Sequence, residues 1–368
     1  MFDYSTLEEK QINKAKPHTV KKFELLEAYA KGWVEKILSI PSCNGVIFID
    51  CMSNNGVYKN IDGEFVEGTP IRIAKLLNTS IVRYTDKDAL LFFNDITKNK
   101  IDTLKTVLDE DSLTNVTIDY SVGDANSFLN SFIINKYNKY HILLLYDPYQ
   151  ATINWKALSP FLKKWCDIII NHMVSDTIRG LPQAKKDTKK EKYANTYKKN
   201  IDDLISLGSD RESLENIIED IIRKGMVGKE EKYIASSPFY NTKNILLYNL
   251  VLCTGNSKAF DLFKNVSWKT FEGKSSLAKN KQLDGQFEIN LSNPAEIISC
   301  IEDGCYSIGN IADFLYAEHK GKGEISNNEV YIPLRYHPIF PAKGFLPQIK
   351  KVLKSSYNVE CKKSTMVF

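Results

Sequence analysis

The sequence lacks the features of a secreted, membrane-spanning or disulfide-stabilised protein. No window reaches about 18 uninterrupted apolar residues, so no membrane span is expected. The first ten residues, MFDYSTLEEK, are charged and contain no apolar segment of the kind found in signal peptides. The seven cysteines are scattered through apolar runs and include no C-x-x-C pair, which argues against a disulfide framework. We therefore expect a soluble, cytoplasmic protein.

Metal ligands are also sparse. Cys300 and Cys305, in the stretch CIEDGC, come nearest to one half of a metal site. The five histidines offer no closely spaced second pair of ligands to complete it. We therefore predict no metal site. Hydrophobic residues make up 43% of the 368 residues and charged residues 26%, which is ordinary for a folded cytosolic protein. The net charge of +4 permits a nucleic-acid partner without requiring one.

Short apolar runs alternate with amphipathic segments through the first half of the chain. Apolar runs of about six residues that alternate with helices of about twelve indicate βαβ units, hence an α/β fold with a mostly parallel sheet covered on both faces. The expected strands are 45–52, 89–95, 116–122, 141–147 and 167–174, and the expected helices are 18–38, 70–78, 97–108, 123–134 and 155–165.

Beyond residue 175 the composition changes. Residues 184–199 carry seven lysines against two acids, and residues 201–225 are typical of an amphipathic helix. Two strand-like pieces, 232–240 and 243–255, could extend the sheet, and the polar stretch 272–286 is a plausible linker. Two short helices within 293–321, a strand at 329–336 and a helix at 345–356 suit a small winged-helix module or a helical appendage.

Acidic residues follow four successive predicted strands. They are Asp50, Asp95, Asp124 within the stretch GDAN, and Asp147 within DPY. Each one alone is best explained as a helix cap or turn residue. All four in order, with turn glycines after the first and third strands, favour a ligand site, because ligands of open parallel sheets bind beyond the carboxyl ends of the strands. The absence of G-x-G-x-x-G at the first turn weighs against NAD or FAD.

Three motifs then follow one another along residues 15–275: H-T-x-x-K at 18–22, G-T-P at 68–70 and D-P-Y at 147–149. In combination they resemble the three-Cys-motif partner proteins (TcmP), a family similar to adenine-N6 RNA methyltransferases. The resemblance implies a Rossmann-like methyltransferase fold with a small winged-helix-like C-terminal region. It also implies S-adenosylmethionine as cofactor, a nucleic acid as partner, and a second protein that carries the three-cysteine motif.

The resemblance assigns roles to particular residues. Those that match the cofactor site are Asp50, Ser53 and Gly56 in the first loop, Asp95 for the ribose, and Asp124 and Ala125 for the adenine. Those that match the acceptor site are Asp147, Pro148 and Tyr149. There, Asp147 and the Pro148 carbonyl would accept hydrogen bonds from an exocyclic amine of a base, and Tyr149 would stack on that base.

The first loop departs from the family pattern. Relatives read D-x-F-A-G-P-G, whereas this chain reads D-C-M-S-N-N-G, so only the last glycine remains. Glycines serve there because the backbone turns at positive φ close to the ligand, although Asn54 or Asn55 can adopt the left-handed conformation at modest cost. Two hypotheses follow: an S-adenosylmethionine-dependent methyltransferase acting on RNA or DNA, or an inactive relative that binds nucleic acid or a partner protein.

The lysine run is a candidate nucleic-acid surface. Its proposed phosphate contacts are Lys185, Lys186, Lys189, Lys190 and Lys192. In the same segment, Tyr193 or Tyr197 could stack on a base, or the segment could be a solvated insertion without a partner. The predicted organisation is therefore an N-terminal helical region (1–40), a Rossmann-like domain (41–275) with a basic insertion near 180–200, and a winged-helix-like domain (290–368).

Overall fold

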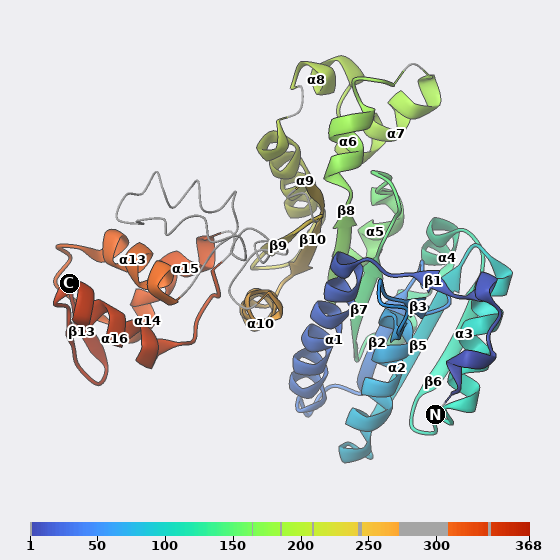
Figure 1. Cartoon of the computed structure of the whole chain (residues 1–368), viewed down its shortest axis with the longest axis horizontal. Helices are drawn as coiled ribbons and strands as arrows, with labels where there is room; N and C mark the ends of the chain where they lie inside the picture. Colours follow the sequence, from blue (N-terminus) through green and yellow to red (C-terminus); the bar gives the residue numbers. More distant parts are fainter. Residues whose placement is uncertain are drawn as a thin grey trace. The chain divides into compact units, whose positions relative to one another are not determined.

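The computed structural model describes residues 2–163, 165–184, 186–207, 210–241, 245–271, 308–337 and 340–368. The chain divides into two compact units (Figure 1). One comprises Met1–Ile234 with Leu247–Ala259, and the other comprises Ala235–Leu246 with Phe260–Phe368. The potential metal half-site at Cys300 and Cys305 and the predicted linker at 272–286 lie outside the described residues, as does most of the first helix expected within 293–321.

A seven-stranded sheet carries the candidate site. Its order is β6-β5-β2-β7-β8-β10-β9. The strands are β2 (Gly45–Asp50), β5 (Asp88–Asp95), β6 (Thr117–Val122), β7 (Tyr140–Tyr146), β8 (Cys166–His172), β9 (Tyr233–Tyr240) and β10 (Leu246–Thr254). The β2, β5, β6, β7 and β8 strands pair in parallel, and β10 pairs antiparallel with β8. This is a Rossmann-like α/β fold, and the predicted mostly parallel central sheet is confirmed.

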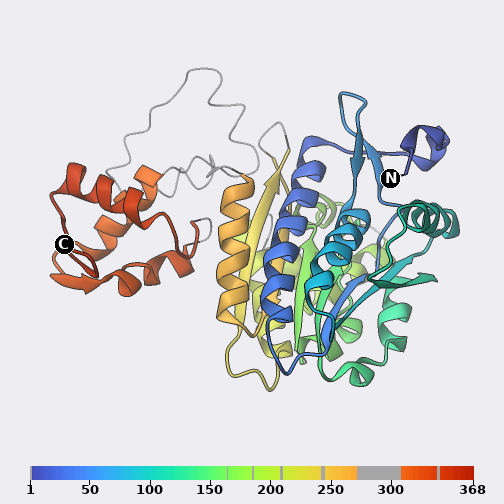
Figure 2. The same cartoon turned by 90° about the horizontal axis from the view of Figure 1, so that it is seen from below.

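Helices cover both faces of the sheet (Figures 1 and 2). On one face α1 (Pro17–Leu38) packs on α2 (Thr69–Ser80), which contacts α3 (Lys98–Glu110). On the other, α5 (Trp155–Leu162) packs between α4 (Ala125–Ser131) and α9 (Arg211–Gly225). The β2 strand is buried over its whole length, as expected for a strand with helices on both sides. Both α1 and α2 carry proline in the first turn, where its missing N–H is harmless.

A second, smaller sheet joins the N-terminal segment to the two short strands that follow β2, and it was not predicted from the sequence. Its strands are β1 (Asn13–Lys14), β3 (Val57–Lys59) and β4 (Phe65–Glu67), in the order β1-β3-β4. The β1 strand pairs in parallel with β3, and β3 pairs antiparallel with β4. Two 3-10 turns, η1 (Tyr4–Thr6) and η2 (Glu9–Gln11), precede it. This sheet brings the N-terminal segment against the loop that follows β2.

Past the carboxyl end of β8 the chain forms α6 (Val174–Gly180), α7 (Asp187–Tyr197) and α8 (Ile201–Ser206) (Figure 1). The lysine-rich segment is therefore largely helical. The single helix expected over 201–225 is instead two helices, α8 and α9. Each has its own capping side chain, because Asn200 accepts from the Asp203 N–H and Asp210 accepts from the Ser213 N–H.

The second unit contains α10 (Ser257–Thr270) and a set of short C-terminal elements. These are α13 (Ile308–His319), β11 (Glu324–Ser326), α14 (Asn327–Val330), α15 (Ile332–Tyr336), α16 (Leu346–Tyr357), β12 (Glu360–Cys361) and β13 (Thr365–Val367). The three strands form an antiparallel sheet in the order β11-β13-β12. The predicted strand at 329–336 is wrong. Ser326 and Glu329 form a capping box that starts α14, and a proline lies in the first turn of α15.

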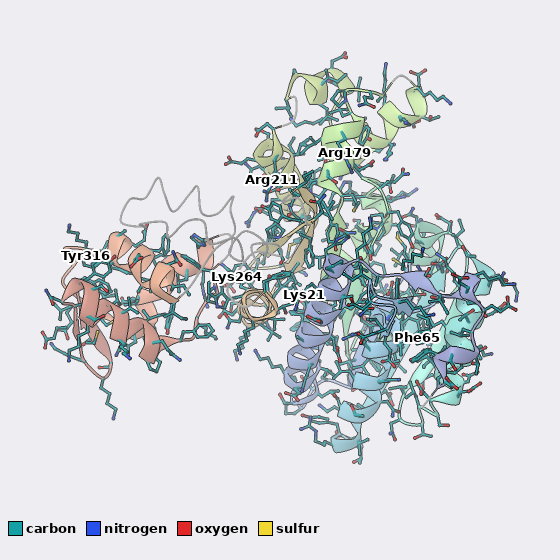
Figure 3. All side chains as sticks on the ribbon, viewed as in Figure 1. Lys21, Phe65, Arg179, Arg211, Lys264 and Tyr316 are labelled. Carbon is teal, nitrogen blue, oxygen red and sulfur yellow. The ribbon has the colours of Figure 1, made fainter. Side chains whose placement is uncertain are left out.

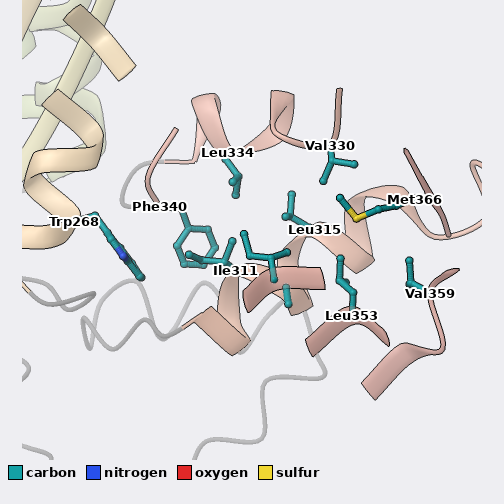
Figure 4. Close-up of a cluster of buried hydrophobic side chains, with 11 residues drawn as sticks. Trp268, Ile311, Leu315, Val330, Leu334, Phe340, Leu353, Val359 and Met366 are labelled. Atoms are coloured by element: carbon teal, nitrogen blue, oxygen red, sulfur yellow. The ribbon is translucent and has the colours of Figure 1, made fainter. Parts of the chain in front are cut away.

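The second unit has its own hydrophobic core (Figure 4). Its buried side chains come from α10, α13, α15, α16 and the small sheet, and include Trp268, Ile311, Leu315, Leu334, Phe340, Leu353 and Met366. Lys264 on α10 (labelled in Figure 3) is buried, and its ammonium donates to the carbonyls of Leu334 (2.6 Å), Arg335 (3.0 Å) and His337 (2.5 Å). These carbonyls lie at the end of α15, and the Leu334 carbonyl also accepts from the His337 N–H at 3.3 Å.

Among the described residues, no helix combines the length and the apolar character needed to cross a membrane. The five cysteines that the structure describes are all free thiols.

Candidate active site

The strand pairing places three of the predicted acids at one edge of the sheet. Asp50, the last residue of β2, is aligned with Phe93 of β5 and Leu145 of β7. Asp95 and Asp147 each lie two residues beyond those partners, so they stand about 7 Å further along the strand direction. The chain runs from β2 outward to β5 and β6, and then returns to β7 on the other side of β2. Asp50 and Asp147 thus flank the topological switch point, where ligands of such sheets bind.

Asp50 is a buried carboxyl group, with 3% of its surface exposed. One of its oxygens accepts from the Met52 N–H at 3.2 Å. Burial raises the pKa of Asp50 to about 8, and the nearby Asp147 and Asp95 carboxylates act in the same direction. A pKa shift of this kind in a strand-end carboxyl group is typical of a functional site.

The glycine-poor loop after β2 still makes the turn that the fold requires. Asn54 takes the left-handed conformation with φ of 58°, and Gly56 follows with φ of 72°. A Cβ atom on Gly56 would lie 2.8 Å from Ile71 Cγ1, so only glycine fits there without a shift. The prediction that an asparagine can replace a glycine in this loop is confirmed at Asn54.

The Asp95 carboxylate fixes two loops at once. Its Oδ2 atom accepts from the Asn54 N–H at 3.0 Å, and its Oδ1 atom accepts from the Thr97 N–H at 2.9 Å. The residue is 4% exposed. Ser53 is also turned inward, because its hydroxyl donates to the Asn94 carbonyl at 3.2 Å. Both side chains therefore hold the first loop against the end of β5.

The N-terminal segment is tied to the same loop through Asn55. The Asn55 amide donates to the Gln11 carbonyl, and its oxygen accepts from the Asn13 amide and from the Val57 N–H. Asn55 is 4% exposed. A further hydrogen bond, from Asn54 Nδ2 to the Tyr149 hydroxyl at 3.2 Å, joins this loop to the acceptor motif.

The acceptor motif Asp147-Pro148-Tyr149 directly follows β7. Lys22 of α1 pairs with Asp147 Oδ2 at 2.6 Å, and Asn171 at the end of β8 donates to Asp147 Oδ1. Pro148 is buried, whereas Tyr149 is 70% exposed. The side chain of Tyr149 is thus available for contact with a ligand and is not packed in the core.

Lys22, Asn171 and Tyr58 belong to the site but were given no role from the sequence. Burial raises the pKa of the Tyr58 hydroxyl, and Tyr149 and three acids, Asp147, Asp50 and Asp95, raise it further, in that order. All four groups are thus near one tyrosine on β3. A signal existed for Asn171, which occupies the same strand-end position on β8 that the acids occupy on the earlier strands. Tyr58 belongs to the small sheet, which the sequence pattern did not reveal.

Asp124 and Ala125 open α4 at the end of β6. Asp124 is exposed and caps the helix, because its Oδ1 atom accepts from the Ser127 N–H at 2.9 Å and from the Ser127 hydroxyl at 3.0 Å. Ala125 is buried at 8% exposure. At Asp124 the structure therefore shows the capping role that any single strand-end aspartate is expected to have.

The lysine run is less available than the sequence indicates. Lys192 pairs with Asp176 at 2.7 Å and donates to Gln150 Oε1 at 2.9 Å. Tyr193 and Tyr197 are 2% and 1% exposed, so the expectation that either stacks on a base is wrong. They are buried because they face α6 and β8. Lys186 and Lys189 are exposed and Lys190 is partly exposed, while Lys185 lies outside the described residues.

No family model matches the sequence, and no curated protein matches it. Solved structures are similar to it at low identity. A Legionella pneumophila protein of the family DUF519 has a TM-score of 0.40 and 8% identity, covering 70% of this chain and 94% of its own. The O-methyltransferase TomG from Streptomyces achromogenes, solved with S-adenosylmethionine, has a TM-score of 0.34 and 9% identity, covering 63% of this chain and 78% of its own. An rRNA methylase from Streptococcus thermophilus has a TM-score of 0.29 and 10% identity, covering 61% of this chain and 92% of its own.

Proposed function

We propose that this protein is an S-adenosylmethionine-dependent methyltransferase that acts on an exocyclic amine of a nucleic-acid base, of the adenine-N6 type. The observation that carries the proposal is the meeting of Asp50, Asp95, Asp147 and Tyr149 at the switch point of a Rossmann-like methyltransferase sheet. The effect of Asp147 and Asp95 on the pKa of Asp50, the effect of all four groups on the pKa of Tyr58, and the Asn54–Tyr149 hydrogen bond support the same grouping.

The side chains present fit the chemical groups of this cofactor. S-adenosylmethionine, when bound, supplies an activated methyl group and carries an ammonium, two ribose hydroxyls and an adenine. Asp50 accepts from a single N–H within the described chain, so the carboxylate that it forms on releasing its proton can take the ammonium. Each Asp95 oxygen accepts from one backbone N–H and has a lone pair left for a ribose hydroxyl. Ala125 provides an apolar contact for the adenine.

The acceptor motif has the polarity that an amine substrate requires. The Asp147 carboxylate and the Pro148 carbonyl can accept hydrogen bonds from an exocyclic amine and orient its nitrogen, so that most of the rate comes from positioning. Lys22 and Asn171 hold the two Asp147 oxygens, which fixes the carboxylate for this role. The exposed Tyr149 ring can stack on an unpaired base, since a base within a duplex has to be flipped out at an energetic cost.

A second candidate function is a scaffold without methyl transfer, and one group of contacts favours it. Asn54 and Asn55 fill the loop where related enzymes have glycines, and Asn55 bonds to Gln11 and Asn13 of the N-terminal segment. In this alternative the same fold holds nucleic acid or a protein partner without a cofactor.

Two further features belong to the proposal. The order helix, strand, helices, strand, strand from α13 to β13 suits a winged-helix module, and we propose that this C-terminal unit helps to hold the nucleic acid. We also propose, from the family resemblance alone, a partner protein with a three-cysteine motif. Neither feature is needed for the catalytic argument.

Transfer of a radiolabelled methyl group to unstructured RNA and DNA oligonucleotides that contain adenine tests the function. The wild type is expected to label them, and Asp147→Ala to label them at least 100-fold more slowly, as for loss of a positioning group. Asp62→Ala is the matched control, because Asp62 is an exposed acid in the turn between β3 and β4. Equal labelling by all three proteins would remove Asp147 from the mechanism, and the absence of labelling by the wild type would favour the scaffold.

A further inference from the structure

Three lysines from two parts of the chain line one hollow. Lys156 lies in the first turn of α5, Lys163 follows its last residue, and Lys198 follows the last residue of α7. Together with Asn135 of η4 (Ile134–Tyr137) and Ser159, they line a hollow of about 670 Å³. The sequence pattern does not group these lysines, because 35 positions separate Lys163 from Lys198.

The hollow is basic without being neutralised. None of its lining residues is acidic. Within the described chain, Lys156, Lys163 and Lys198 form no ion pair, in contrast to Lys192, which pairs with Asp176 at 2.7 Å. Three exposed lysines of like charge line this one space, so an anion bound there is favoured.

Lys198 occupies a position that its side chain does not favour. Its backbone is left-handed, with φ of 48°, at the end of α7. Glycine or asparagine adopts this conformation at lower cost, and other residues pay roughly 1 kcal/mol. The Lys198 ammonium lies 5.9 Å from the centre of the Trp155 ring. The chain thus keeps a lysine at a strained position that directs a positive charge toward the hollow.

The wall of the hollow is joined rigidly to the acceptor motif. Thr196, two residues before Lys198, donates its hydroxyl to the Ala151 carbonyl at 2.8 Å and accepts from the Ile153 N–H at 3.2 Å. The Trp155 indole donates to the Thr196 carbonyl at 2.7 Å. The segment that starts at Asp147 therefore runs directly into the wall that presents Lys156 and Lys198.

We propose that this hollow binds backbone phosphates of a single-stranded nucleic acid whose base is presented at Tyr149. The lysines of the hollow, and not the run at 185–192, then supply the main phosphate contacts. Seven residues separate Lys156 from Lys163, a rise of about 10 Å along a helix, which matches about three phosphates of a stacked strand. The proposal deepens the proposed function and rests on it for the identity of the base.

Two triple variants that remove the same charge test the proposal. The first is Lys156→Gln, Lys163→Gln and Lys198→Asn, where asparagine keeps the left-handed cap. The control is Lys186→Gln, Lys189→Gln and Lys190→Gln. Binding of a fluorescein-labelled 20-nucleotide single-stranded RNA to the full-length proteins is measured by anisotropy between 50 and 300 mM salt, without cofactor.

The expected result follows from counterion release. Each phosphate contact to a single strand adds about 0.7 to the slope of log K against log salt. The first triple variant is expected to lower that slope by about 2 and to weaken binding at 0.1 M salt by up to about a hundredfold. The control variant is expected to change the affinity less than threefold.

Other outcomes overturn the proposal. Equal losses in the two variants would mean diffuse attraction, a larger loss in the control would place the phosphates on the lysine run, and no binding by the wild type would remove the site. Calorimetry with S-adenosylmethionine on the first variant separates the two proposals. If the first variant loses RNA binding and S-adenosylmethionine gives no heat, the phosphate site in the hollow is supported and the methyltransferase proposal is rejected.

Discussion

Replacement of Asp50 by asparagine should change how the stability of the protein depends on pH. The pKa of Asp50 is raised from 3.8 to about 8 in the folded protein, so between these values the folded state binds a proton that the unfolded state has released. The free energy of unfolding must therefore fall as pH rises through that window. Each pH unit changes the free energy of unfolding by about 1.4 kcal/mol, and the whole window changes it by roughly 6 kcal/mol.

The asparagine side chain in the Asp50→Asn variant would mimic the protonated acid at every pH, since an amide oxygen can still accept from the Met52 N–H. The difference in unfolding free energy, Asp50→Asn minus wild type, is expected to rise by about 1.4 kcal/mol per pH unit between pH 5 and 7. It should level off above pH 8, where the folded wild type has lost the proton.

Urea unfolding of both proteins at constant ionic strength from pH 5 to 9 measures this difference. Groups that titrate equally in the two proteins cancel in the subtraction. Asp62→Asn, at an exposed loop position, should follow the wild type throughout. A difference between Asp50→Asn and wild type that stays constant over the whole range would refute the reasoning, because Asp50 would then titrate alike in the folded and unfolded chain.

Three other substitutions test the contacts around the site and in the second unit. Lys22→Met should destabilise the protein by about 1–2 kcal/mol in urea unfolding, because it leaves the partly buried Asp147 without its ion pair. Gly56→Ala should cost about 1–3 kcal/mol in the same measurement, since the added Cβ meets Ile71 at positive φ. Lys264→Met should lower the thermal unfolding temperature of the second unit and cost about 2–3 kcal/mol, because buried carbonyls lose their donor.

The fold of the first unit could be predicted because its strands are buried on both faces. Such strands are continuous apolar runs, and β2, β5, β7 and β8 begin and end within two residues of the predicted positions. The predictions failed where local capping decides the structure. Ser326 and Glu329 start a helix in a segment whose alternating pattern favours a strand, and Asn200 and Asp210 divide one expected helix into two.

The candidate site was predictable only for groups that sit at strand ends. Asp50, Asp95 and Asp147 could be placed together, because parallel strands deliver their last residues to one edge. Lys22 reaches Asp147 from 125 positions away, and Tyr58 comes from a three-residue strand of the small sheet. Side chains that arrive through tertiary packing leave no local pattern in the sequence.

The lysine run shows the limit of composition as a guide to a binding surface. A dense cluster of like charges usually indicates a solvated or anion-binding face. Here Lys192 is paired with Asp176, and both tyrosines of the run are buried against the neighbouring helix and strand. Lysines without an ion pair within the described chain also line the hollow, at Lys156, Lys163 and Lys198, which only the fold brings together.

Isothermal titration calorimetry with S-adenosylmethionine and with its demethylated product tests the central claim most directly. The account predicts micromolar binding of both compounds to the wild type. It also predicts at least tenfold weaker binding to Asp50→Asn, which keeps the shape of the side chain but cannot release a proton to form the carboxylate that receives the ammonium. No heat with the wild type, or equal affinity in the two proteins, would contradict it.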